Sequence, residues 1–262
     1  MIDIHNHILP GLDDGARSIE TAVGMTRIAA QSGMQGIIAT PHVITGIFDN
    51  KRQKILQAVE RLNNILKQQN ISLLIMPGAE YHLEPDLVRR FNAGELLTLN
   101  DTGRYLLVEL PETLVPDYST QILYELQLAG ITPVIAHPER NQHLMTNPNL
   151  LQTISACGAV MQLTAASLTG LFGSVVQNNA WRLISGGGHS SIVATDAHST
   201  RGRVPSLDVA YLQICARLGK EAAQILCSEN PQRVAQGLDL EPCPVVRPNI
   251  WPCLRRLMVR TS

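Results

Sequence analysis

Residues 2–42 read IDIHNHILPGLDDGARSIETAVGMTRIAAQSGMQGIIATPH, and the architecture of the chain can be predicted from them. They begin with a short apolar run, Ile2–His5, and continue through a helical pattern, Ser18–Ser32, in which apolar residues share one face. Ser18 is suited to cap the start of this helix. A second apolar run, Gly36–Ala39, follows. A strand, a helix and a strand in this order predict two parallel strands joined by a helical crossover.

The same alternation continues along the chain. Short apolar runs predict seven strands, at Ile2–His5, Gly36–Ala39, Ile71–Met76, Tyr105–Leu110, Thr132–Ala136, Ala159–Leu163 and Ser191–Thr195. The amphipathic segments between them predict helices at Ser18–Ser32, Lys51–Gln69, Pro85–Ala93, Asp117–Ala129, Pro148–Cys157 and Ser174–Ser185. Such alternation is typical of an α/β fold with a parallel sheet, which is either closed as a barrel or open and doubly wound.

The last part of the chain departs from this alternation. Further helical segments follow the last strand, at Pro205–Leu218, Glu221–Cys227 and Pro231–Leu238. Asn230 is suited to cap the helix that starts at Pro231. Residues 242–252 contain four prolines, which exclude a regular helix over most of this stretch. We therefore expect one domain over residues 1–240 and a Pro/Arg-rich tail over residues 241–262, either partly ordered or an arm that docks a partner or an acidic surface.

The composition excludes several classes of function. Lys and Arg total 21 against 22 Asp and Glu, and the net charge of -1 provides no basic field for nucleic acid or anionic lipid. Aromatic residues make up only 4%, which argues against base stacking. The five cysteines are odd in number and lack CxxC spacing, so neither a disulfide framework nor a cysteine zinc site is expected. Neither a signal peptide nor a stretch suited to membrane insertion is found, so we expect a cytoplasmic protein.

The most informative feature is the residue type that follows each predicted strand. Histidine or a carboxylate ends six of the seven strands, in the segments His5-Asn6-His7, Thr40-Pro41-His42, Gly78-Ala79-Glu80, Glu109, His137-Pro138-Glu139-Arg140 and Asp196-Ala197-His198. In a parallel α/β fold the carboxyl ends of the strands gather at one face, where ligands are bound. Imidazoles and carboxylates without lysines are costly to desolvate unless cations lie among them. The sequence therefore predicts a metal site.

The ligand types and their number limit the choice of metal. The eight residues are His5, His7, His42, Glu80, Glu109, His137, Asp196 and His198. Histidine nitrogen and carboxylate oxygen without thiolate suit divalent Mn, Fe, Zn or Mg. Because His5 and His7 alternate by two, they can face the same way at a strand end. Together with Asp13 or Asp14 from the loop LDDGA, the eight are too many for one ion, so we expect two or three ions that share bridging carboxylates.

Six motifs carry a resemblance to a known family. They are HNHILPGLDDGARS, ATPH, GAEYHL, VELP, IAHPER and TDAHS, in this order over about residues 1–240. Together they resemble the PHP (polymerase and histidinol phosphatase) superfamily, and specifically its bacterial manganese-dependent protein-tyrosine phosphatases of capsule and exopolysaccharide gene clusters. The resemblance implies a distorted (β/α)7 TIM-like barrel, the PHP fold, with C-terminal helices and a trinuclear site in which Mn is the expected ion.

The resemblance also implies roles for individual residues. Its metal ligands fall on His5, His7, Asp14, His42, Glu80, Glu109, His137, Asp196 and His198, with Glu80 as a bridge. Arg140 matches the family's phosphate-holding arginine, and either Arg201 or Arg203 matches a second one, with the spacing favouring Arg203. The implied substrates are phosphotyrosines on a tyrosine autokinase that controls polysaccharide export. The region of the helix Ser18–Ser32 contributes to oligomer contacts in that family, so a homo-oligomer is expected.

The chemistry of phosphate monoester hydrolysis suggests how such a site would work. The reaction needs an activated water, neutralisation of charge on the phosphoryl oxygens and help for the leaving oxygen. We expect a hydroxide that bridges two metals to attack phosphorus in line, because metal coordination lowers the pKa of water. Arg140 and a third metal would hold the phosphoryl oxygens. His42 or His198 could give a proton to the leaving group only if it is not fully committed to metal.

Other functions compete with this one. Cys227 begins a C-x5-R sequence typical of cysteine phosphatases, but Glu229 and Pro231 do not suit a phosphate cradle. A metal amidohydrolase also opens with HxH, but no lysine stands at a predicted strand end to form a carbamate bridge. An inactive regulatory metal-binding module and a small-molecule phosphatase of the histidinol-phosphate type stay open as alternatives. His82, close to Glu80, is expected at the rim of the site or behind the ligands.

Overall fold

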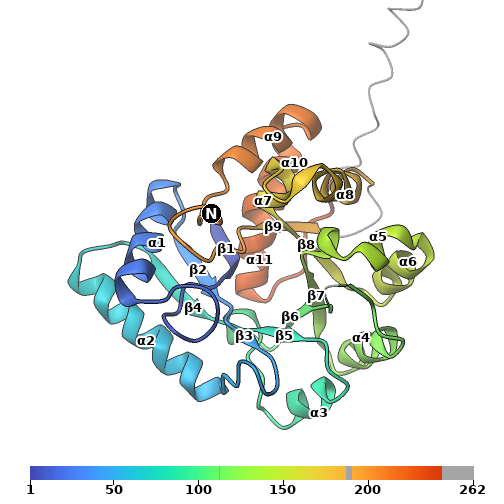
Figure 1. Ribbon diagram of the computed structural model, residues 1–262, viewed down its shortest axis with the longest axis horizontal. Helices are drawn as coiled ribbons and strands as arrows, with labels where there is room; N and C mark the ends of the chain where they lie inside the picture. The colour runs from blue at the N-terminus through green and yellow to red at the C-terminus, as the bar shows by residue number, and fades with distance from the viewer. Residues whose placement is uncertain (112, 187–190, 244–262) are drawn as a thin grey trace, which may run out of the picture.

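The computed structural model describes residues 1–111, 113–186 and 191–243. Short parallel strands lie in the middle of the molecule and helices surround them (Figure 1). The strands are β1 (Ile2–Asn6), β2 (Gly36–Ala39), β3 (His42–Val43), β4 (Leu74–Pro77), β5 (Glu80–His82), β6 (Tyr105–Glu109), β7 (Thr132–Ala136), β8 (Val160–Thr164) and β9 (Ser191–Ala194). The helices are α1 (Ile19–Gln31), α2 (Arg52–Gln68), α3 (Leu87–Asn92), α4 (Ser119–Leu128), α5 (Gln142–Thr146), α6 (Pro148–Ala156), α7 (Ala165–Thr169), α8 (Gly173–Ser185), α9 (Asp208–Leu218), α10 (Lys220–Gln224) and α11 (Asn230–Gln236).

The strands pair in chain order. One sheet has the order β1-β2-β4, the other the order β3-β5-β6-β7-β8-β9, and every pairing between these strands is parallel. Only Thr40-Pro41 separates β2 from β3, and only Gly78-Ala79 separates β4 from β5. If each of these two pairs is counted as one interrupted strand, the described residues contain the seven strands that the sequence predicts.

The two ends of this strand order meet between β9 and β1. A single bridge pairs Asn6 with Ala197, and the N–H groups of Asp196 and His7 donate to the carbonyl oxygens of His5 and Ala197, each at 2.9 Å. Within the described ranges this contact takes the place of a continuous ladder. The prediction of a parallel α/β fold is confirmed, and the strands follow the order of a barrel while their ladders form two sheets.

A β-bulge in β1 changes the direction of the first histidine. The register with β2 advances by three residues on β1, from Asp3 to Asn6, but by only two on β2. Ile4 packs into the apolar cluster between the strands, and the ring of His5 also lies on this inner side, where it contacts Gln162 of β8. Strict alternation with Ile4 would turn the side chain of His5 outward. The bulge instead directs it toward the centre of the strands.

Two apolar layers hold the strands in place. The outer layer lies between the strands and the helices and includes buried residues of α1, α2, α4, α6 and α8. The inner layer lies between the strands and includes Val234 and Ala235 of α11. Many of the buried polar residues, among them His7, Thr164 and Asp196, lie instead at or just after the carboxyl ends of the strands. The closely packed apolar layers thus hold the strands, and with them the polar side chains at the strand ends, in fixed positions.

The helices test the capping predictions. Ser18 caps α1, because its hydroxyl accepts from the N–H of Thr21 at 3.3 Å. The cap predicted at Asn230 is wrong, since a π-helical turn, Ile225–Glu229, runs into α11 without a break. The side chain of Asn230 instead donates to the carbonyl of Glu241 at 3.0 Å and accepts from its N–H at 2.8 Å. The short helices α5 and α7 were not predicted.

Part of the chain lies outside the described residues. The tail predicted over residues 241–262 belongs to that part from residue 244 onward, so the division between a domain and a tail stays a prediction. None of the helices in the described ranges combines the length and the apolar character that a membrane span requires.

Candidate metal centre

The strand ends bring the nine predicted ligands to one place. Their donor atoms form four groups, and within each group the atoms lie within 4.8 Å of one another: His7, Asp14, His42 and His198; His5, His7 and Asp196; His5, Glu80 and His137; and His42, Glu80 and Glu109. His5, His7, His42 and Glu80 each belong to two groups. The groups therefore overlap through shared residues, which suits two or three cations that share ligands.

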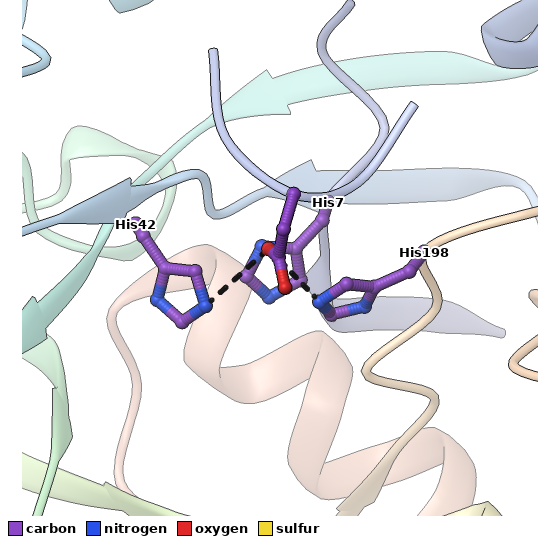
Figure 2. A group of neighbouring side chains, drawn as sticks. His7, His42 and His198 are labelled. Carbon is purple, nitrogen blue, oxygen red and sulfur yellow. Dashed lines mark ion pairs between the residues drawn. The ribbon is translucent and has the colours of Figure 1, made fainter. Parts of the chain in front are cut away.

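The outermost group contains three imidazoles that face one another across Asp14. Figure 2 shows the rings of His7, His42 and His198 converging. Asp14 Oδ1 lies 3.4 Å from His198 Nε2 and 3.7 Å from His42 Nε2. The side chain of Asp14 is 55% exposed whereas that of His7 is buried. This group therefore links the buried centre to solvent.

Glu80 occupies the middle of the site. Its Oε2 lies 3.1 Å from His5 Nε2, 3.3 Å from His7 Nε2 and 3.1 Å from His42 Nδ1, and its Oε1 lies 3.2 Å from His137 Nε2. Burial raises the pKa of Glu80, but the surrounding imidazoles outweigh burial and hold the pKa well below its ordinary value. An ionised carboxylate that faces four imidazoles is suited to bridge cations.

The pKa values of the site show how strongly its charges interact. Burial lowers the pKa of His5, but the charges of Glu80 and Asp196 outweigh burial and raise it. Burial also lowers the pKa of His7, but the hydrogen bond to Asp13 and the carboxylates of Asp196 and Glu80 outweigh burial and hold this pKa well above its ordinary value. Burial and the charge of Glu80 raise the pKa of Glu109 to about 8. Protons and divalent cations therefore compete for the same donor atoms.

Two buried polar atoms test whether a cation fits. Asp196 Oδ1 has no hydrogen-bond partner among the described residues, although it lies 3.4 Å from both His5 Nε2 and His7 Nε2. His42 Nδ1 also lacks a well-aligned hydrogen bond there, although it lies 3.1 Å from Glu80 Oε2. Buried polar atoms without a partner are rare, and a cation in the donor group of each atom would satisfy it. The imidazole and carboxylate donors fit Mn, Fe or Zn.

Asp13 and Asp14, which the composition of the loop could not distinguish, have different places. Asp14 belongs to the outermost donor group. Asp13 Oδ2 lies 2.7 Å from His7 Nδ1 and accepts from the N–H of His42 at 3.0 Å. A Cβ at Gly15 would lie 2.1 Å from the carbonyl oxygen of His7, so only glycine permits this loop to approach so closely. Asp13 therefore orients two of the histidines.

Two arginines border the inner groups. Arg140 donates from Nη2 to Asp196 Oδ2 at 2.6 Å and to Thr164 Oγ1 at 3.0 Å. Arg203 forms an ion pair with the same carboxylate and donates from Nε to the Asp196 carbonyl at 3.1 Å. Arg201 is exposed, and within the described ranges its side chain forms no ion pair with a candidate ligand. Of the two candidates for the second arginine, the geometry thus favours Arg203.

A buried network below the ligands holds the chain as it leaves β9. Asp3 accepts from the N–H and the hydroxyl of Thr195 and, at 2.9 Å, from Asn6 Nδ2. Burial raises the pKa of Asp3 although these hydrogen bonds oppose the change. The next residue, Asp196, has φ +51°, a left-handed conformation that residues other than glycine rarely adopt. The network fixes the backbone next to this turn and so positions Asp196.

Three buried residues of the site could not be found from metal-ligand patterns. They are Asp3, Gln162 and Thr164, which are fully buried and lie within β1 and β8. The available signal was a polar side chain in an otherwise apolar strand, because such a residue needs a partner when it is buried. In β8, Gln162 and Thr164 alternate with apolar residues and therefore share one face.

His82 and Cys227, which the sequence analysis does not assign as metal ligands, lie outside the donor groups. His82 is partly exposed and belongs to none of the four donor groups found among the described residues. Cys227 is fully buried in the π-helical turn, and burial raises the pKa of its thiol. A buried protonated thiol does not suit a nucleophile, which argues against the cysteine mechanism.

The fold and these donor groups define a class, the α/β proteins that carry a cluster of histidine and carboxylate side chains at the ends of parallel strands. The chain belongs to the CpsB/CapC family of capsular polysaccharide synthesis, whose family model matches residues 1–236. The family resemblance drawn from the six motifs is thereby confirmed.

Relatives and a solved structure support this assignment over most of the chain. Tyrosine-protein phosphatase YwqE of Bacillus subtilis (strain 168) is 38% identical over 232 residues, which are 88% of this chain and 90% of that protein. Tyrosine-protein phosphatase CpsB of Streptococcus pneumoniae is 29% identical over 238 residues, 89% of this chain and 98% of that protein. A crystal structure from work on YwqE and CpsB, described as metal-dependent tyrosine phosphatases, superposes with a TM-score of 0.88 at 37% identity and covers 94% of this chain and 100% of that chain.

Proposed function

We propose that this chain is a metal-dependent protein-tyrosine phosphatase that acts in capsular or extracellular polysaccharide synthesis. The observation that carries the proposal is the position of Arg140 and Arg203 beside four overlapping groups of imidazole and carboxylate donors. Phosphate monoester hydrolysis needs both features, cations to activate water and donors to bind the phosphoryl oxygens. The names of the family members YwqE and CpsB support the substrate class.

The nine candidate ligands would hold two or three divalent cations, and Mn is the ion that we propose. Such cations, when bound, lower the pKa of water toward neutrality and neutralise phosphoryl oxygens. The contribution of the chain is to fix the donors. Glu80 would serve as the bridge, because it faces four imidazoles, and Asp14 would complete the group closest to solvent.

Arg140 and Arg203 would bind the phosphoryl group. Both hold the carboxylate of Asp196, and each guanidinium has five N–H donors, so further donors are left for phosphoryl oxygens. Because Asp196 is also a candidate ligand, its two ion pairs fix the guanidinium groups relative to the donor groups. This arrangement presents positive charge where the transferred group gains negative charge.

We assign His42 and His198 as ligands rather than general acids. Burial lowers the pKa of both imidazoles below the ordinary value, although nearby carboxylates oppose the change. Near neutral pH both are therefore neutral, with a lone pair for a cation and no proton to give. A tyrosine phenol with a pKa of about 10 is a good leaving group, so weak assistance suffices.

The surroundings of Arg140 support the proposed substrate class. A cavity of about 210 Å³ is lined by Glu109, His137 and Arg140 and also by the apolar residues Leu110 and Ala136. Polar and apolar walls side by side suit a phosphorylated phenol, with its phosphate toward the cations and its ring against the apolar wall. We propose phosphotyrosines of a tyrosine autokinase as the protein substrate.

We also propose that the chain forms a homo-oligomer through the region of α1. Arg17, Glu20 and Arg27 are exposed on or next to this helix and leave charged groups for a second copy. Mass measurement in solution tests this point. A species larger than one chain supports it, and only monomer at working concentrations contradicts it.

The functional test is phosphate release from a phosphotyrosine peptide by protein purified with Mn. We expect turnover that excess EDTA abolishes and that exceeds turnover of histidinol phosphate. A preference for histidinol phosphate would replace the assignment by a small-molecule phosphatase. If neither substrate is turned over while Mn is bound, an inactive regulatory module or an amidohydrolase is the better interpretation.

The variant Cys227→Ala is the matched control for the cysteine mechanism. Because this thiol is buried and belongs to none of the donor groups found in the described part of the chain, we expect the variant to keep its activity. Turnover that resists EDTA and disappears in Cys227→Ala would contradict the metal mechanism.

A further inference from the structure

Gln162 lies in β8 with its side chain among the metal-ligand candidates, although an amide is not a preferred ligand for these metals. It is fully buried, and its neighbours Met161 and Leu163 pack in the outer apolar layer. Its Oε1 lies 2.7 Å from His5 Nδ1 and accepts from the N–H of His137 at 3.4 Å. One oxygen thus contacts a histidine from β1 and the backbone of the residue that follows β7.

The contact with His137 identifies which atom of the amide faces the site. A backbone N–H can only donate, so the atom that faces it must be the amide oxygen. The same oxygen can accept from His5 only if Nδ1 of His5 carries the hydrogen. In the neutral ring, the lone pair then lies on Nε2 of His5. That atom is 3.1 Å from Glu80 Oε2 and 3.4 Å from Asp196 Oδ1.

The other end of the amide argues against a role in packing alone. Gln162 Nε2 is buried and has no hydrogen-bond partner among the described residues. A buried donor without a partner destabilises the fold, and an apolar side chain of similar size would avoid this cost. The presence of an amide at this position is therefore explained by the contacts of its oxygen with His5 and His137.

We propose that Gln162 is a positioning residue that fixes the tautomer and the ring orientation of His5, so that Nε2 is the atom offered to a cation. The inference rests on the proposed metal-dependent function and adds the residue that orients one of its two fully buried histidines. The two histidines of the HxH motif are oriented differently, since the partner of His7 Nδ1 is the carboxylate of Asp13. A neutral amide accepts the same hydrogen without adding charge beside Glu80 and Asp196.

Three variants test this inference. Gln162→Leu removes the acceptor, Gln162→Glu keeps an acceptor at the same reach, and Met161→Leu is a control on the same strand that faces the outer layer. Mn binding is measured by calorimetric titration of the full chain. Loss of a hydrogen-bond partner behind a ligand typically costs 10- to 100-fold in metal affinity. We expect a loss of about this size in Gln162→Leu and affinity close to the parent in Met161→Leu. In Gln162→Glu we expect affinity at least equal to that of the parent, because the carboxylate still accepts the hydrogen of His5 and its negative charge attracts the cation.

A spectroscopic readout separates positioning from a general effect on folding. In protein loaded with diamagnetic Zn, the Nδ1–H of His5 is expected as a ring N–H signal in nitrogen-edited NMR spectra. The signal should persist in Gln162→Glu and Met161→Leu and be lost or strongly shifted in Gln162→Leu. Parent-like Mn affinity and an unchanged signal in Gln162→Leu would overturn the proposal.

The two remaining outcomes are also decisive. If Gln162→Leu fails to fold, Gln162→Glu still decides, because loss of the ring N–H signal with the acceptor retained would contradict the role of the oxygen. If the parent binds Mn but hydrolyses no phosphotyrosine peptide, the proposed function fails. The inference about Gln162 then stands or falls on metal affinity and the NMR signal alone.

Discussion

Arg140 Nη2 lies 2.6 Å from Asp196 Oδ2, and the other oxygen of the same carboxylate lies 3.4 Å from His5 Nε2 and from His7 Nε2. Asp196 thus joins a proposed phosphate-binding group to two proposed metal ligands through one side chain. Changes on the arginine side should affect substrate recognition, whereas changes at the centre of the donor groups should affect cation binding as well.

Arg140→Lys should separate substrate binding from cation binding. The variant keeps the positive charge but removes the planar fork that matches a phosphoryl group. Hydrogen bonds to charged groups contribute about 1.5–3 kcal/mol, so we expect kcat/KM on a phosphotyrosine peptide to fall roughly 10- to 100-fold. Bound Mn should stay unchanged. Arg201→Lys, at an exposed position, is the control that should match the parent, and a loss of Mn in Arg140→Lys would contradict the division of roles.

Glu80→Gln should disable the centre of the site. The amide has nearly the same shape but lacks the charge that faces four imidazoles. Loss of a group behind a ligand costs about 10- to 100-fold, so loss of the central carboxylate should lower activity by at least about 100-fold. Metal analysis should find less Mn per chain. Glu84→Gln, which removes an ion pair with Arg90 away from the donors, should retain both Mn and activity.

The stabilisation by Mn should increase with pH. The pKa values of His5 and His7 lie above their ordinary value, and that of Glu109 is raised to about 8. Groups with a raised pKa in the folded state stabilise the fold below their unfolded pKa and lose this contribution as pH rises through the folded value. Without cations the protein should therefore lose stability between about pH 6 and pH 9, whereas bound Mn takes the place of the protons.

Thermal unfolding with Mn and with EDTA measures this effect. The difference in Tm between the two conditions should grow from about pH 6 to about pH 8.5, because fewer protons compete with the cation at higher pH. The lowered pKa of Glu80 acts only at more acidic pH and does not change the sign in this window. A difference that stays constant or shrinks would contradict the competition between protons and cations.

Asp3→Asn should weaken the support of Asp196. Asp3 accepts three hydrogen bonds, from the N–H and the hydroxyl of Thr195 and from Asn6. In the variant one acceptor oxygen becomes an NH2 donor, so the side chain can no longer accept all three. We expect a loss of about 1–3 kcal/mol in the free energy of unfolding, measured by urea denaturation. Asp86→Asn removes an exposed ion pair and should cost less than about 1 kcal/mol. Equal losses in the two variants would argue against the buried network.

The sequence predicts which candidate ligands come together because topology dictates where strand ends meet. Histidine or carboxylate after successive parallel strands must come together at one face, whatever the details of the loops. The choice between Asp13 and Asp14, and between Arg201 and Arg203, was harder. Both choices depend on how a loop turns, for example on the close approach that Gly15 permits.

Other features depend on geometry that no local pattern encodes. The β-bulge in β1 changes the direction of His5 relative to strict alternation. Gln162 carries no metal-ligand side chain, and its partner His5 is 157 positions away in the chain. Asn230 resembles a helix cap, but the preceding π-helical turn continues into α11, and its side chain binds the backbone of Glu241. In each case tertiary contacts override the local preference.

The central claim is that the overlapping donor groups bind the cations that hydrolysis requires. The most direct measurement adds Mn stepwise to chelator-treated protein and records both bound Mn and phosphate released from a phosphotyrosine peptide. We predict that activity is absent at the start, rises with bound Mn and saturates at two or three ions per chain. Full turnover before any Mn is bound, or saturation of the site with no turnover, would contradict the account.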